Sequence, residues 1–125
     1  MINKQAPNDL NERTFKFALR IIKLLQYLPN NKYNEILGKQ LLRSSTSIGA
    51  NYREANESLT KKDFIHCAVI CKKEAKETKF WLDLLFETNP SLQNRMLKLQ
   101  EETIELIKIF STMVKNAQEK LELGA

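Results

Sequence analysis

The chain has 125 residues, of which 42% are hydrophobic and 28% charged, and its formal net charge is +5. This length fits one globular domain, and the composition is too apolar for a disordered protein. No run approaches the ~18 apolar residues of a membrane span, and the polar leader over residues 1–8 lacks the apolar segment of a signal peptide. We therefore expect a cytoplasmic protein with no membrane partner.

A first helix is predicted over about residues 9–28, ending before Pro29. Apolar side chains at spacings of three and four predict one buried stripe, formed by Phe15, Ala18, Leu19, Ile22 and Leu25. Opposite it runs a stripe of cations without an acid inside it, formed by Arg13, Lys16, Arg20 and Lys23. Such a stripe either faces water as an ordinary outer surface or follows the phosphates of a nucleic acid.

A second helix is predicted over about residues 32–59, and beside its apolar stripe lies a regular row of small and polar residues. The row consists of Ser44, Ser47, Asn51, Glu54 and Ser58. Consecutive serines are unfavourable in mid-helix, so a compensating interaction is expected. One interpretation is a row that faces water. The other is a close helix contact, within one bundle or between copies, across which Asn51 and Glu54 form hydrogen bonds.

Two further helices are predicted over about residues 61–88 and 91–122. Thr60 followed by Asp63 suits a helix start, and the Asn89–Pro90–Ser91 turn separates the last two helices. Four helices of this length with short connections predict an all-α, antiparallel, up-down-up-down four-helix bundle that occupies residues 1–125 as one domain.

Catalytic chemistry finds little support in the sequence. His66 is the one histidine and has no recognisable catalytic partner, and the Glu-x-x-His spacing of di-iron bundles is absent. Cys67 and Cys71 lie four apart, too far for a disulfide within one helix, and are most simply core residues. We expect no catalytic residue, metal, cofactor or small-molecule substrate; a metal-dependent activity of Cys67, Cys71 and Glu74 is a third hypothesis.

Several segments of helices two and three carry a resemblance to a known family. The segments are Arg43–Ala55, Lys62–Ile65, Lys73–Thr78 and Trp81–Leu82. Together they resemble the bacterial four-helix-bundle proteins associated with intervening sequences in 23S ribosomal RNA genes. Ser47, Ile48, Asn51 and Glu54 fall on that family's most characteristic positions, whereas Ala55 stands where many members have Gly.

The resemblance implies an antiparallel bundle that assembles into a homopentameric ring. Relatives include the accessory proteins of diversity-generating retroelements, which are basic and bind nucleic acids. The family name refers to a genomic location and does not imply a ribosomal protein.

Together these observations predict a self-assembling bundle that binds structured RNA or DNA through phosphate contacts of Arg13, Lys16, Arg20 and Lys23, with little base selectivity. The alternative is a protein-interaction scaffold without a nucleic-acid role. A steep loss of nucleic-acid affinity with salt favours the first, and salt-insensitive binding of a protein favours the second.

Overall fold

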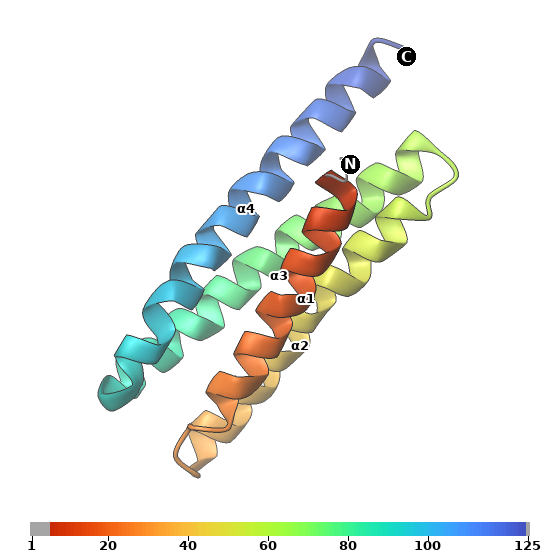
Figure 1. The fold of residues 1–125 in the computed structure, drawn as a ribbon. Coiled ribbons are helices and arrows are strands. Elements are labelled where there is room, and N and C mark those ends of the chain that lie inside the picture. The colour runs from red at the N-terminus through yellow and green to blue at the C-terminus, as the bar shows by residue number, and fades with distance from the viewer. Residues whose placement is uncertain (1–5, 125) are drawn as a thin grey trace.

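The computed structural model describes residues 6–124, and every regular element in that range is helical. The elements are α1 (Ala6–Leu25), α2 (Lys32–Asn56), α3 (Lys61–Thr88), a short 3₁₀ turn η1 (Pro90–Leu92) and α4 (Gln93–Glu122). Consecutive long helices run in opposite directions (Figure 1). The predicted all-α four-helix bundle is therefore confirmed. Between residues 6 and 124, no helix combines the length and apolarity needed to cross a bilayer.

The helix ends follow local capping chemistry. The side chain of Asn31 accepts a hydrogen bond from the backbone N–H of Asn34 at 2.8 Å, and Thr60 does the same for Asp63 at 3.0 Å. The first two long helices are about three residues shorter at their C-terminal ends than expected, since α1 ends at Leu25 and α2 at Asn56. The last helix begins at Gln93, because Pro90 opens η1 instead.

All four long helices contribute side chains to the core. The large, fully buried side chains there include Leu41, Ile48, Leu82, Leu85, Met96, Leu106 and Phe110. Contacts at two levels show the register of α2 against α3: Ser44 contacts Thr78, and Asn34 contacts Asn89, the residue that follows α3. In both pairs the residue numbers add to nearly the same value, as antiparallel neighbours require.

The buried face of α1 differs from the prediction. The buried residues are Leu10, Thr14, Phe17, Ile21 and Leu24, whereas Phe15, Leu19 and Ile22 are 56%, 44% and 38% exposed. The reason is that α1 carries two apolar stripes at helical spacing, offset from one another around its axis. Only one of them can face the bundle, so the other remains on the surface.

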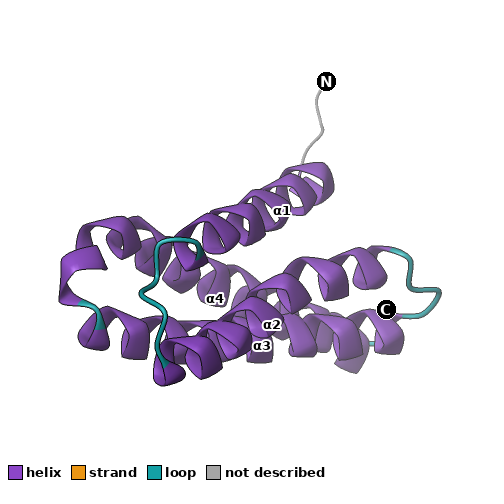
Figure 2. Cartoon of the chain, turned by 90° about the horizontal axis from the view of Figure 1, so that it is seen from below, coloured by secondary structure: helices purple, strands orange, loops and turns teal. Residues whose placement is uncertain are grey.

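Contacts on α1 are made chiefly with α2, and Figure 2 shows α1 inclined away from the other helices. Gly49 allows a close approach there, because a Cβ atom at this position would lie 3.0 Å from Thr14 Oγ1. Against α4, α1 is held by Arg13, which binds Glu102. The N-terminal part of α1 therefore covers α4 only partly.

A buried amide pair joins the first turn of α2 to the turn that follows α3 at one end of the bundle. Asn34 Nδ2 donates to Asn89 Oδ1 at 3.0 Å, and Asn89 Nδ2 donates to Asn34 Oδ1 at 2.9 Å. Each amide also donates to a backbone carbonyl, of Pro29 and of Leu85 respectively. These bonds fasten the α1–α2 connection to the α3–α4 connection.

Candidate nucleic-acid interface

Basic side chains from two helices converge on one hollow of the surface. It has a volume of about 340 Å³ and lies between the C-terminal half of α1 and the first turns of α4. Its cations are Arg20, Lys23, Arg95 and Lys98; the other lining residues are Leu24, Tyr27, Asn94 and Leu99. None of these lining residues is acidic, so the four charges, called the basic hollow below, add to one positive potential.

Tyr27 places an aromatic ring beside these charges. It lies in the turn after α1, is 53% exposed, and has the guanidinium carbon of Arg95 at 3.6 Å from its ring centroid. This cation–π contact orients Arg95 at the surface without neutralising it. An anionic ligand in the basic hollow would therefore meet a charge that is already positioned.

In the structure two members of the predicted cation stripe, Arg13 and Lys16, form salt bridges. Arg13 forms a two-pronged salt bridge with Glu102, with Nε–Oε2 at 2.6 Å and Nη2–Oε1 at 2.9 Å. The hydrogen bonds that Arg13 donates to the Glu102 carboxylate raise the pKa of Arg13. Lys16 Nζ lies 3.2 Å from a carboxylate oxygen of Glu12. Of the four cations, Arg20 and Lys23 reach the basic hollow.

Carboxylates limit the basic hollow on one side. Arg20 and Lys98 also line a neighbouring depression of about 510 Å³ together with Glu101, Glu102 and Glu105. An approaching phosphate is repelled there and attracted on the side of Lys23 and Arg95. The charge distribution therefore gives an anion one preferred direction of approach.

Sequence reasoning missed Arg95, Lys98 and Tyr27. Lysines and arginines balance the acids along the last third of the chain, so counting charges by segment hides these cations. Two features could have predicted these cations. Arg95 and Lys98 are three residues apart and so share a face of α4, and the antiparallel order of the helices brings the start of α4 beside the end of α1.

The residues of the polar row on α2 differ in burial and in hydrogen-bond partners. Ser44 is fully buried, and its hydroxyl lies 2.8 Å from that of Thr78 on α3. Ser47 and Asn51 are half-buried, and Asn51 Nδ2 donates to the carbonyl of Ser47 in its own helix at 2.9 Å. Glu54 is exposed and Ser58 half-buried, with the Ser58 hydroxyl donating to the Glu54 carbonyl at 3.3 Å.

Arg43 supplies a charge link across the α2–α3 contact. Its Nη1 lies 3.1 Å from Glu74 Oε1, and its Nη2 binds Glu77. On α3 itself, Lys79 pairs with Asp83 at 2.6 Å.

The cysteines lie on the core side of α3. Cys71 is fully buried, and its thiol donates to the Ile48 carbonyl at 3.5 Å, while Cys67 is half-buried. Among residues 6–124, no group of three or more His, Cys, Asp or Glu side chains is arranged to hold a metal ion. Glu74, the third residue of the metal hypothesis, binds Arg43.

Burial raises the pKa of the Cys71 thiol from its ordinary 9.0 to about 12. As pH rises, the thiol loses its proton at a lower pH in the unfolded chain than in the folded one. The free energy of unfolding is therefore unaffected by this thiol below pH 9.0 and decreases as pH rises from there to about 12. We expect Cys71→Ala to reduce this alkaline loss of unfolding free energy, measured by urea titration.

In the folded protein at pH 8, mass spectrometry should show iodoacetamide on Cys67 well before Cys71. Equal labelling rates would contradict this assignment.

Comparison with known proteins adds two findings. The family model described as 23S rRNA-intervening sequence protein matches residues 8–112. A crystal structure of a protein of unknown function from the S23 ribosomal protein family of Bacteroides thetaiotaomicron is 36% identical, covers 84% of this chain and 97% of its own, and superposes with a TM-score of 0.76. The corresponding comparison with curated proteins gives no match.

Proposed function

We propose that this chain, which belongs to the 23S rRNA-intervening sequence protein family, is a self-assembling, non-catalytic bundle that binds structured RNA or DNA. The observation that carries this proposal is the basic hollow, in which Arg20, Lys23, Arg95 and Lys98 converge without an acidic lining residue. Clustered cations gain affinity for phosphates by releasing counterions from the nucleic acid.

The side chains of the basic hollow are better suited to binding the nucleic-acid backbone than to recognising individual bases. All four of its cations are exposed lysine or arginine side chains on the surfaces of helices, the arrangement that neutralises phosphates. Tyr27 is the one aromatic residue that lines it, and Arg95 covers one face of its ring. Successive base stacking needs several free aromatic faces, so little base selectivity is expected.

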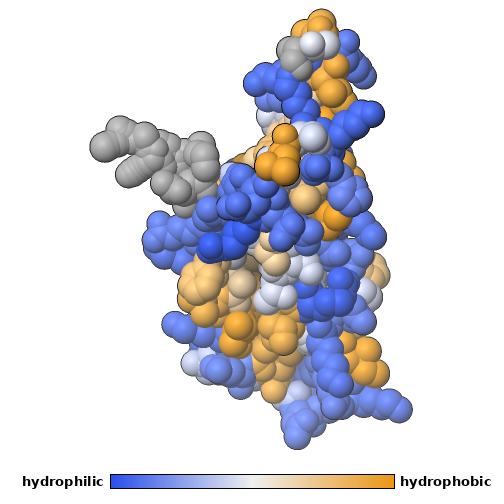
Figure 3. Space-filling view, turned by 90° about the vertical axis from the view of Figure 1, so that its right-hand side faces the viewer, coloured by the Kyte–Doolittle hydropathy of each residue, from blue (hydrophilic) through white to orange (hydrophobic). Residues whose placement is uncertain are grey.

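Self-assembly is supported by the second apolar stripe of α1, formed by Phe15, Leu19 and Ile22 and called the outer stripe below. In a space-filling view of the side that includes α1 and α2, apolar side chains gather in an area framed by hydrophilic ones (Figure 3). Exposed apolar areas of this kind are typical of protein interfaces. We propose the outer stripe as the contact between copies in a homopentamer.

Assembly would multiply the basic hollow. A homopentamer carries five copies of a site with four cations, or about twenty charges, and simultaneous contacts raise the effective affinity for a long ligand. A weak phosphate site on one subunit thus becomes a useful site on the assembly.

Charge reversal in the basic hollow tests the binding proposal. We expect Lys23→Glu with Arg95→Glu to lower the affinity for a mixed-sequence RNA hairpin or DNA duplex by more than about tenfold at low salt, measured by fluorescence anisotropy. The wild-type affinity should fall steeply with salt, and the variant should show a shallower slope.

A matched variant controls for net charge. Lys39→Glu with Lys115→Glu makes the same charge change at exposed positions outside the basic hollow, so its affinity should fall much less. Equal losses in both variants would mean that only overall charge matters. Negligible wild-type affinity at low salt would contradict nucleic-acid binding and leave the scaffold alternative.

A further inference from the structure

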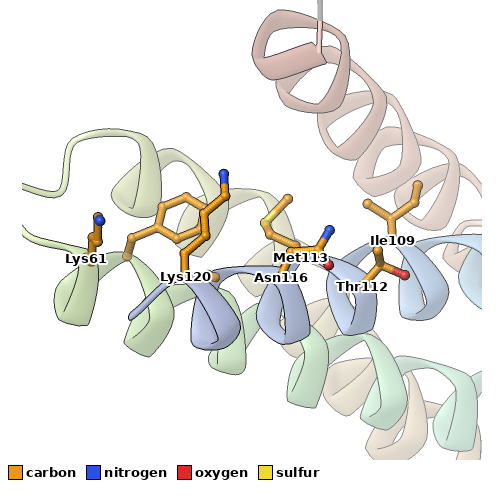
Figure 4. Close-up of a pocket in the computed structure, with 8 residues that line it drawn as sticks. Lys61, Ile109, Thr112, Met113, Asn116 and Lys120 are labelled. Carbon is orange, nitrogen blue, oxygen red and sulfur yellow. The ribbon is translucent and has the colours of Figure 1, made fainter. Parts of the chain in front are cut away.

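An apolar groove lies at the other end of the bundle from the basic hollow. It has a volume of about 500 Å³ and runs between the start of α3 and the C-terminal half of α4. Its lining is formed by Lys61, Phe64, Ile109, Thr112, Met113, Asn116, Ala117 and Lys120. Figure 4 shows Lys61 and Lys120 at one end of this groove and Ile109 at the other.

The groove continues the line of α1 along α4. Arg13 binds Glu102, and α1 runs antiparallel to α4, so the first turn of α1 lies at about the level of Ile109. Beyond that level α4 continues to Glu122, a distance of roughly 20 Å at 1.5 Å per residue. Along this stretch α4 extends past the described start of α1 (Figure 1).

The spacing of the groove residues suits a helical occupant. Ile109, Met113 and Ala117 repeat every four residues along α4, and Phe64 faces them from α3. Two antiparallel helices that present one apolar seam form the seat for a further helix packed by ridges and grooves. An amphipathic helix laid into such a groove is a recurrent mode of peptide recognition.

The charges of the groove select the occupant. Lys61 and Lys120 are exposed at the same end, and no acidic residue lines the groove. The outer stripe of a second copy is a poor match, because Lys23 lies beside Ile22 at that stripe and would bring a like charge toward Lys61 and Lys120. We propose that the groove binds an amphipathic helix of another protein, with an apolar stripe toward Ile109, Met113 and Ala117 and carboxylates beside Lys61 and Lys120.

Two synthetic peptides test this proposal. One is a labelled, end-capped helix of about 14 residues with leucines on one face and glutamates elsewhere, and the other has lysines in place of the glutamates. Fluorescence anisotropy with the full chain at low salt should show the glutamate peptide binding at least about tenfold more tightly. Absence of binding, or equal affinity for both peptides, would overturn the proposal.

Charge reversal of the groove supplies the matched variant. Lys61→Glu with Lys120→Glu alters two exposed side chains and should reverse the preference, so that the lysine peptide binds more tightly. Met113→Gln keeps the side-chain size and should weaken both peptides by removing apolar contact. An unchanged preference after charge reversal would overturn the proposal. If the charge-reversed variant instead dissociates an oligomer that the wild-type chain forms, the occupant of the groove is a second copy, and the proposal is overturned.

Discussion

Replacing Asn34 by alanine is expected to lower the free energy of unfolding by about 2–4 kcal/mol. Asn34 and Asn89 are 3% and 5% exposed and exchange two hydrogen bonds. The substitution leaves Asn89 Oδ1 and the Pro29 carbonyl without the donor that Asn34 Nδ2 supplies to each. Small domains are stable by only about 5–15 kcal/mol, so this loss should be visible in a urea titration followed by circular dichroism.

A double-mutant cycle tests whether the two amides act as a pair. Once Asn34 has been replaced, Asn89→Ala should cost at least about 1 kcal/mol less than it does in the wild-type chain. Asn94→Ala is the matched control, because this asparagine is exposed on α4 and its loss should change stability by less than about 0.5 kcal/mol. An Asn34 effect as small as that of Asn94 would show that the amide pair contributes little.

The sequence predicts the parts of the fold that depend on local periodicity. On α2, α3 and α4 the apolar residues that repeat at helical spacing include Ile48, Leu82 and Leu106, and these three are fully buried. Caps such as Thr60 are equally local, because the side chain binds a backbone N–H three residues later. Such features need no knowledge of the neighbouring helix.

Features that depend on the partner helix escape sequence reasoning. On α1 both apolar stripes satisfy the helical period, and only packing against α2 and α4 selects Phe17 and Ile21 over Phe15 and Ile22. The link between Asn34 and Asn89 joins residues 55 positions apart.

The candidate site shows the same division between local and long-range information. Arg20 and Lys23 are visible in the sequence as part of a cation stripe, because both lie on α1. Arg95 and Lys98 join them only through tertiary structure. The salt bridge of Arg13 with Glu102, which removes one predicted cation from the stripe, is likewise a contact between distant helices.

Leu19→Asp is expected to convert a homopentamer into monomers without unfolding the chain. Leu19 is 44% exposed, so a carboxylate there remains in water in the monomer and costs the fold little. In an assembly built through the outer stripe the same carboxylate would be buried without a partner in every subunit contact, at a cost of several kcal/mol each. Light scattering after gel filtration should show the mass fall from about 73 kDa, five times the chain mass of 14.6 kDa, to that of one chain.

Leu97→Asp is the matched control, because Leu97 is a leucine of similar exposure, 46%, on α4. It makes the same chemical change outside the outer stripe, so the assembly should persist. A wild-type chain that elutes as a monomer would contradict self-assembly itself. Dissociation by Leu97→Asp but not by Leu19→Asp would place the contact between copies on α4. Loss of helical circular dichroism in Leu19→Asp would instead indicate that Leu19 supports the fold, so the spectrum must be recorded on the same sample.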